Sequence, residues 1–295
     1  MARFADIEAR YAYFPVEGVE YRVFIEQAGQ GIPVLLQHTA GSDGRQWRHL
    51  LEDPEITRHF RLIAYDLPYH GKSLPPLSER YWETEYKLTQ SWFMNFVVTL
   101  SDELELDRPI YMGCSMGGHL APDLALHYPE KFRAVIGVEA TAKTGGSGER
   151  LRYLSHPRIS NEAKSAMMLT LCAPTAPEPF RRETVWCYGQ GAPPVFKGDL
   201  NYYTLEHDVT GTAGNIDTGK VEVHILNGDY DWSGHVAAGK ALADQIPGAT
   251  WTRMDGLGHF PMSEDPVGFK RYLMPILDGI RERSGRVGKR SSPPG

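Results

Sequence analysis

A serine and a histidine stand in glycine-rich segments where a chain could use them for nucleophilic catalysis. Ser115 lies at the centre of Gly113-Cys114-Ser115-Met116-Gly117, between an apolar run and a stretch of helical periodicity. A sharp strand-to-helix turn needs small residues there because the chain doubles back closely, and it exposes the serine hydroxyl. His259 follows the last apolar run, in Gly256-Leu257-Gly258-His259. These residues predict attack of a serine hydroxyl on a carbonyl carbon, with His259 as the base.

A histidine base needs a carboxylate that holds its tautomer and stabilises the imidazolium. Asp229 and Asp231 directly follow the apolar run 221–226, and Glu139 directly follows the run 133–138. Each of the three would lie at the end of a predicted strand. The spacing alone leaves all three open as partners of the base.

The developing negative charge in such a reaction needs hydrogen-bond donors. A helix that starts directly after Ser115 points its first amides at the reacting atoms, and its dipole favours negative charge. We therefore expect the backbone N–H of Met116 to form part of an oxyanion hole.

The elements that must hold these residues alternate along the chain. Residues 11–27 alternate apolar and polar side chains around Glu17-Gly18, the pattern of an antiparallel hairpin. Further on, apolar runs and helical periodicity take turns, which predicts an α/β fold with a mostly parallel twisted sheet and helices on both faces. The predicted strands are 33–37, 60–65, 109–113, 133–138, 221–226 and 250–254, and the predicted helices are 84–106, 116–128, 235–246 and 266–280.

One long segment breaks this alternation. Residues 141–212 hold no clear strand and are rich in proline and glycine, and a connection of this length is usually a functional lid or insertion. We expect residues 1–140 and 213–280 to form the core, 141–212 a cap, and 281–295 a disordered tail. The aromatic residues of the cap segment are Tyr153, Trp186, Tyr188, Phe196, Tyr202 and Tyr203.

Composition excludes several classes of protein. The 295 residues are 41% hydrophobic and 23% charged with a net charge of −6, which is typical of a globular protein and gives no attraction to nucleic acid. No apolar run reaches the length of a membrane span and the start lacks a signal-peptide pattern, so we expect a cytoplasmic protein without a membrane partner. Three cysteines without a C-x-x-C pair argue against disulfides or zinc. No metal or cofactor is expected, and the oligomeric state is unknown.

Taken in order, these motifs resemble those of the α/β-hydrolase superfamily. His38-Thr39-Ala40-Gly41 is similar to its His-Gly loop, although Thr39 stands where glycine is usual, and Asp66–Ser73 is similar to its D-x-P-G-x-G-x-S loop. The resemblance implies that Ala40 supplies the second oxyanion N–H. It also implies that Gly228-x-x-Asp231 carries the acid, in the order Ser115, Asp231, His259.

Two other acids stay in competition under the same resemblance. Some members, such as the zearalenone lactonases, carry their acid at the place of Glu139, and Asp229 lies too near Asp231 to be separated by pattern. Asp231 is favoured, then Glu139, then Asp229.

The implied reaction is hydrolysis through an acyl-enzyme without a cofactor. The aromatic cap segment suggests an ester or lactone of an apolar or aromatic small molecule, with Trp186, Tyr188 and Arg181 as candidate contacts. Arg181, together with Arg182, would suit a substrate carboxylate. Two alternatives remain: a carbon–carbon hydrolase of ring-fission products, which Ser115-Met116-Gly117-Gly118 also resembles, and a ligand receptor of the same fold.

Overall fold

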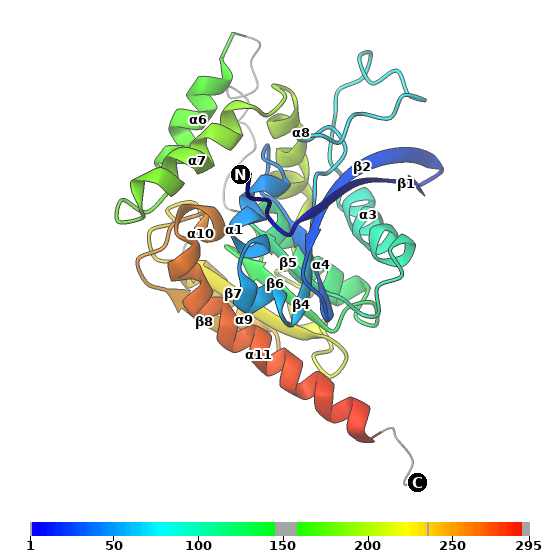
Figure 1. The fold of residues 1–295 in the computed structure, drawn as a ribbon, viewed down its shortest axis with the longest axis vertical. Coiled ribbons are helices and arrows are strands. Elements are labelled where there is room, and N and C mark those ends of the chain that lie inside the picture. The colour runs from blue at the N-terminus through cyan, green and yellow to red at the C-terminus, as the bar shows by residue number, and fades with distance from the viewer. Residues whose placement is uncertain (1, 145–157, 235, 291–295) are drawn as a thin grey trace.

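An eight-stranded sheet runs through the computed structural model, which describes residues 2–144, 158–234 and 236–290, without the side chains of 286–290 (Figure 1). The strand order is β1-β2-β4-β3-β5-β6-β7-β8. The strands from β4 to β8 are mutually parallel, whereas β2 is antiparallel to both β1 and β4. Their bounds are β1 Glu8–Val16, β2 Val19–Ala28, β3 Ile32–Gln37, β4 Phe60–Tyr65, β5 Ile110–Cys114, β6 Ala134–Val138, β7 Glu222–Gly228 and β8 Thr250–Met254.

The predicted hairpin is confirmed, with β1 and β2 joined by a two-residue turn. Val16 pairs with Val19 across the turn. Glu17 and Gly18 both have positive φ angles, of 52° and 83°, as the tight turns that match the twist of a hairpin require. The remaining six apolar runs are strands as predicted, with ends shifted by a few residues at most.

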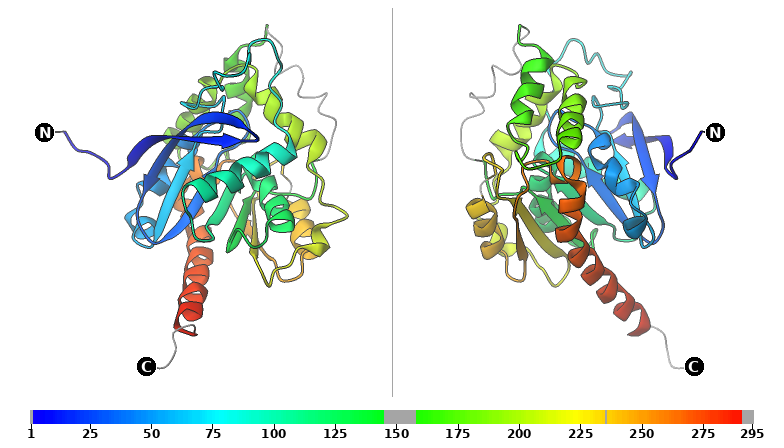
Figure 2. Two further views of the ribbon diagram at one scale, coloured as in Figure 1. Left: turned by 90° about the vertical axis from the view of Figure 1, so that its right-hand side faces the viewer. Right: turned by 60° about the vertical axis from the view of Figure 1, so that its left-hand side comes forward.

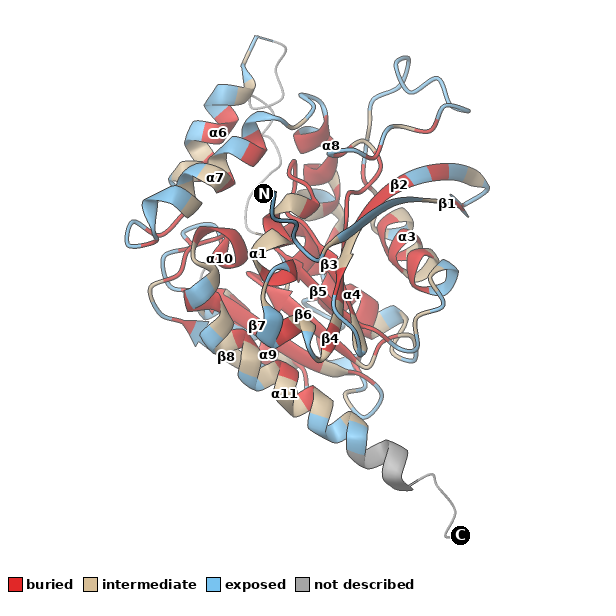
Figure 3. Ribbon diagram, in the orientation of Figure 1, coloured by how far each residue is buried: buried red, intermediate tan, exposed pale blue. Residues whose placement is uncertain are grey.

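Alternation along the inner strands divides the core into two apolar layers. On β3, Leu35 belongs to one layer, and Val34 and Leu36 belong to the other. Successive side chains of a strand point to opposite faces, so both faces of the sheet are buried. Figure 3 shows the inner strands β3, β4, β5, β6 and β7 as almost wholly buried. One layer joins α3 (Gln90–Glu103), α4 (Met116–His127) and α9 (Val236–Gln245), and the other joins α1 (Arg48–Leu51), α2 (Pro54–Thr57) and α11 (Pro266–Arg290).

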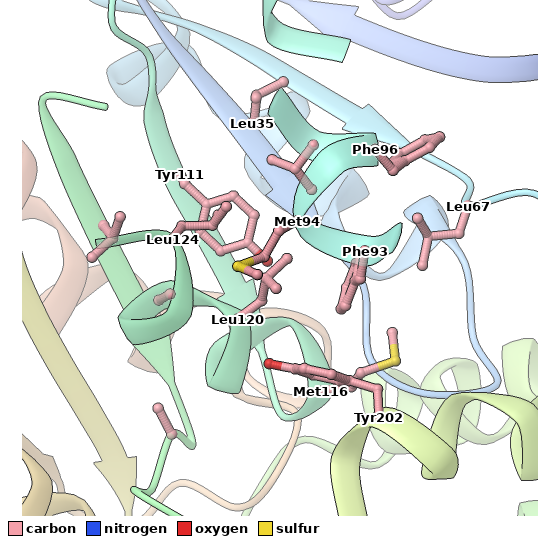
Figure 4. Close-up of a cluster of buried hydrophobic side chains, with 14 of the residues drawn as sticks. Leu35, Leu67, Phe93, Met94, Phe96, Tyr111, Met116, Leu120, Leu124 and Tyr202 are labelled. Carbon is pink, nitrogen blue, oxygen red and sulfur yellow. The ribbon is translucent and has the colours of Figure 1, made fainter. Parts of the chain in front are cut away.

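The first of these layers packs large side chains between the sheet and helices α3 and α4. Figure 4 shows Tyr111 of β5 beside Leu124 and Leu120 of α4, with Met94 of α3 close by. All four are buried. This packing holds α4, the helix that follows Ser115, against the sheet.

Two helix boundaries differ from the prediction. Helix α3 begins at Gln90 and not at 84, because the Thr89 hydroxyl caps it by accepting a hydrogen bond from the Trp92 amide at 3.4 Å. Helix α11 continues to Arg290, ten residues beyond the predicted end at 280 and into the segment expected to be a tail. Its apolar face packs on the sheet only as far as Ile280, and the last turns extend away from the body (Figure 2). Residues 235 and 291–295 lie outside the described residues.

The segment 141–212, called the insertion below, is mainly helical where it is described. It holds α6 (Asn161–Leu169), α7 (Glu178–Gly189), α8 (Val195–Asn201) and one short turn, η3 (Tyr202–Glu206), and a second short turn, η4 (Ala213–Asn215), directly follows it. Helices α6 and α7 pack side by side and lie beyond one end of the sheet (Figure 1). Residue Tyr153 lies outside the described residues. A four-residue helix, α10 (Pro261–Glu264), touches α7 from the core side.

Candidate active site

Ser115 lies at a strained turn between β5 and α4. Its backbone has φ 55° and ψ −115°, a conformation that L-residues rarely adopt and that is found at functional sites. The Ser115 amide donates to the Val138 carbonyl at 2.9 Å, which ties the turn to β6. The residue is 6% exposed. The predicted strand-turn-helix context of the serine is therefore present.

The glycines around Ser115 are required by close approach of the backbone. A Cβ on Gly113 would lie 2.4 Å from the carbonyl carbon of Gly117, and one on Gly117 would lie 2.6 Å from Gln37 Cγ. Neither space accepts a methyl group. The G-x-S-x-G pattern thus has a steric cause in this chain, because β5 and α4 almost touch at their junction.

His259 and Asp231 meet at the same end of the sheet. The Nδ1 atom of His259 lies 2.7 Å from Asp231 Oδ2, and both side chains are buried. The thiol of Cys114 donates to the His259 carbonyl at 3.1 Å, so the histidine loop lies against the turn that carries Ser115. With Nδ1–H donated to Asp231, the Nε2 atom carries the lone pair that a general base uses.

Ser233, which the sequence did not single out, supports the carboxylate. Its amide and its hydroxyl donate to Asp231 Oδ1 at 2.8 and 2.7 Å, and its hydroxyl lies 3.1 Å from His259 Nδ1. Burial alone would raise the pKa of Asp231, but the interactions with His259 and Ser233 outweigh it and lower that pKa. Asp231 is thereby held as an anion. The signal in the sequence was the Asp-x-Ser pattern, typical of a side chain that caps its own turn.

The two competing acids have other partners. Asp229 accepts from the Gly256 amide at 2.7 Å and from Arg253 at 3.1 Å, on the outer side of the turn. Glu139, with φ 55°, accepts from the Gly228 amide at 2.7 Å and adjoins Asp231. Burial, and then the charge of Asp231, raise the pKa of Glu139 well above its usual range. The structure brings only Asp231 into hydrogen-bond contact with His259 among the three.

The loop after β3 carries the Ala40 amide at this end of the sheet. The amides of Thr39, Gly41 and Ser42 donate to Gln46 Oε1, Asp199 Oδ2 and the Thr39 carbonyl. The Ala40 amide has no hydrogen-bond partner within the described part of the chain. Met116 is the first residue of α4, and its amide is among the four that a helix leaves unpaired. Both predicted oxyanion donors are thus available.

Tyr203, from the insertion, reaches the serine. Its hydroxyl lies near enough to the Ser115 side chain to interact with it, and its ring packs edge-on against His119 at 4.7 Å. Burial and the charge of Asp231 raise the pKa of Tyr203, so it stays a hydrogen-bond donor at neutral pH. The sequence marked Tyr203 only as one aromatic residue of the insertion. No local pattern distinguishes it, because the contact joins segments far apart in the chain.

The three predicted substrate contacts fare differently. Tyr188 is buried, with its hydroxyl against that of Thr39 and its ring 5.3 Å from Phe260. Trp186 is 69% exposed on α7, which is a poor position for a pocket residue. Arg181 and Arg182 both bind Glu178 of the same helix, at 3.0 and 2.6 Å. Only Tyr188 lies beside the site residues.

Two kinds of feature are absent from the described residues. They contain no group of three or more histidine, cysteine or carboxylate side chains arranged to hold a metal ion. They also contain no helix that is both long and apolar enough to span a membrane.

Known proteins are similar to this chain in part of its sequence and in its fold. A family described as the alpha/beta hydrolase fold matches residues 32–163. The 2-hydroxy-6-oxo-2,4-heptadienoate hydrolase of Pseudomonas putida is 32% identical over 115 residues, 38% of each chain. A thermophilic esterase from Thermogutta terrifontis superposes with TM-score 0.80 at 20% identity, covering 93% of this chain and 99% of that one. The enol-lactonase from Burkholderia xenovorans gives 0.76 at 20%, covering 90% and 100%.

The sheet, its helices and these likenesses define the class of protein. The chain has the α/β-hydrolase fold. Over residues 32–163 the chain is similar to the α/β-hydrolase family, to which the motifs of the sequence also pointed.

Proposed function

We propose that the chain is a cofactor-independent serine hydrolase that cleaves an ester or lactone of an apolar or aromatic small molecule. The observation that carries the proposal is Ser115 on its strained turn beside the His259–Asp231 pair. The superfamily and the hydrolases to which the chain is similar support the general activity.

In the proposed reaction, His259 Nε2 takes the proton of Ser115 while Oγ attacks the substrate carbonyl carbon. The anionic Asp231 keeps Nδ1 protonated and stabilises the imidazolium that forms. The amides of Met116 and Ala40 stabilise the oxyanion. His259 then gives its proton to the leaving oxygen. Water next attacks the acyl carbon while His259 takes the proton of the water, and His259 returns that proton to Ser115 Oγ as the acid is released.

The surroundings of the site support an apolar or aromatic substrate. Met116 and Phe260 are fully buried, and Phe260 packs edge-on against His259 at 4.8 Å. Tyr188 and Tyr203 approach from the insertion, which we propose acts as the cap of the site. An apolar wall of this kind favours binding of such a substrate, because it buries apolar substrate surface.

Burst kinetics with an activated nitrophenyl ester test the proposal. The wild type should release one equivalent of nitrophenol rapidly, and a fluorophosphonate should add its mass to Ser115. Ser115→Ala should show neither, with an unchanged melting temperature as the control for folding. Full activity in Ser115→Ala, or labelling at another residue, would refute the assignment.

Hydrolysis of a carbon–carbon bond is the second candidate, favoured by the similarity to the heptadienoate hydrolase. Arg181 and Arg182 share the single carboxylate of Glu178, so one positive charge of this group stays unbalanced. A panel of esters, lactones and ring-fission diketones discriminates between the two reactions. A kcat/KM for the diketones above that for every ester would favour the second candidate.

A further inference from the structure

A buried carboxylate of the insertion binds the loop that carries the Ala40 amide. Asp199, on α8, has no exposed surface. Its Oδ2 atom accepts from the Gly41 amide at 2.7 Å and from His70 Nε2 at 2.9 Å, and its Oδ1 accepts from Tyr86 at 3.0 Å. One side chain of the insertion thus gathers three donors from separate loops of the core.

The protonation of its partner keeps Asp199 an acceptor. His70 Nδ1 donates to the Pro68 carbonyl at 2.9 Å, so both ring nitrogens face acceptors and each needs a proton. Burial opposes this charge, but Asp199 outweighs burial and raises the pKa of His70, with a smaller effect from Asp66. His38, whose ring lies 4.8 Å away, stays neutral because burial and His70 lower its pKa to about 4.

Close packing seats α8 directly on this loop. Gly41 has φ 69°, and a Cβ there would lie 2.6 Å from Phe196 Cδ2 of α8. A Cβ on Gly191 would lie 2.6 Å from the Gly41 carbonyl oxygen. The insertion and the loop therefore meet without room for another atom.

Two anchors set the direction of the Ala40 amide. The Thr39 carbonyl accepts from His38 Nδ1 at 2.9 Å and from the Ser42 amide at 3.3 Å. Because the peptide is planar, these bonds orient the N–H of Ala40 on the other side of the same peptide. The next peptide is held only by the bond from Gly41 to Asp199 among the described residues.

We propose that Asp199 is a positioning residue for catalysis, which holds the Ala40 amide in line with the oxyanion while α8 is seated on the core. The inference rests on the proposed serine hydrolase function. On this proposal, the core and the insertion together position the Ala40 amide, the second oxyanion donor.

The test compares Asp199→Ala with Asp199→Asn, whose amide oxygen can still accept from Gly41. Asp199→Ala should lower kcat by about 10- to 100-fold, less than the ~10²–10³-fold loss when an oxyanion donor is removed outright. KM should stay within about twofold, because ground-state binding does not use the oxyanion donor. Affinity for a trifluoromethyl ketone, whose adduct with Ser115 carries an oxyanion, should fall by the same factor as kcat/KM. Asp199→Asn should keep most of the wild-type kcat and most of the wild-type affinity for the ketone.

The control is Asn201→Ala on the same helix. Asn201 donates to the Leu88 carbonyl at 3.1 Å and to Glu206 at 2.8 Å, so its loss also weakens the seat of α8. It should lower the melting temperature without changing kcat. If Asp199→Ala fails to fold because His70 is left as a buried charge, the double variant Asp199→Ala/His70→Leu removes both members of the pair and should show the same loss.

Three results would overturn the inference: wild-type kcat in folded Asp199→Ala, a loss confined to KM, or an Asp199→Asn variant as impaired as Asp199→Ala. Failure of the proposed function is distinguishable from these. In that case the wild type itself shows no burst and no ketone affinity, and Ser115→Ala behaves like the wild type.

Discussion

Two carboxyl groups lie side by side behind His259, and their surroundings give them opposite protonation. Asp231 accepts from His259 and twice from Ser233, which lower its pKa. Burial, and then the charge of that anion, raise the pKa of Glu139 well above its usual range, which favours its neutral form. Two neighbouring carboxylates cannot both ionise cheaply in a buried site. The division of roles between them follows from their hydrogen bonds.

This division predicts unequal effects of neutral substitutions. Asp231→Asn should lower kcat by about 10³- to 10⁴-fold, because an amide cannot hold the required tautomer of His259 or balance its charge. Glu139→Gln should stay within a few-fold of wild type, because glutamine replaces a group that is already neutral. Rates on one ester at pH 7 suffice for the comparison. A larger loss in Glu139→Gln would make Glu139 the acid, and equal small losses would contradict both assignments.

At the scale of elements, the β5–α4 turn depends on three glycines, which allow neighbouring segments of backbone to approach closely. Gly118 is the third, and a Cβ there would lie 2.1 Å from the Val138 carbonyl oxygen. That same oxygen accepts from the Ser115 amide. A displacement of the Val138 carbonyl would therefore also displace the backbone of Ser115.

Gly118→Ala should destabilise the protein by about 1–3 kcal/mol, the usual result of forcing a methyl group into a filled core. Its kcat should fall as well, since Ser115 and Val138 must separate. Gly211→Ala is the matched control, because a Cβ there meets nothing within 4 Å. Calorimetry and ester hydrolysis measure the two effects. Equal melting temperatures for both variants would contradict the prediction, because the turn would then accommodate the added methyl group.

At the scale of the molecule, the insertion is bound to the core by buried polar groups at separate points. Glu264 of α10 accepts from the Ala173 amide at 3.1 Å and from the Gly258 amide at 2.6 Å, next to His259. Asp123 of α4 accepts from Tyr202 at 2.7 Å. With Asp199, these contacts join the insertion to α4, to the loop of His259 and to the loop of Ala40. A movement of the insertion would therefore displace the segments that carry Ser115, His259 and Ala40.

The buried histidine beside this network, His38, makes a pH-dependent contribution to stability. The pKa of His38 is lowered from 6.5 to about 4, so between these values the unfolded chain binds a proton that the native chain does not. Stability is then lost as pH falls from 6.5 toward 4, by about 3 kcal/mol at most at ~1.4 kcal/mol per pH unit. Below about pH 4 both states carry the proton and the loss levels off.

Chemical denaturation between pH 4 and 7 measures this contribution as the difference between wild type and His38→Asn. The variant keeps a donor for the Thr39 carbonyl but cannot titrate. Asp66, whose pKa is raised to about 6 mainly by burial, acts in the opposite direction and is present in both proteins, so its effect cancels. Parallel pH profiles for the two proteins would contradict the prediction.

The amino-acid sequence by itself determined the strands of the sheet, the hairpin and the turn of Ser115. These depend on alternation of apolar side chains and on glycines close in the chain, which act over a few residues. Such local causes can be interpreted without a structure. Helices α6, α7 and α8 were not predicted, because their apolar faces are short and fit the core only as a group.

Only the tertiary structure decided which groups meet. Asp229 and Asp231 follow the same strand, and a single turn sends one toward Arg253 and the other toward His259. Tyr203 and Asp199 reach Ser115 and Gly41 across many residues, with no spacing to announce them. Contacts of this kind depend on how the insertion packs on the core. Packing is a property of the whole surface and not of any local pattern.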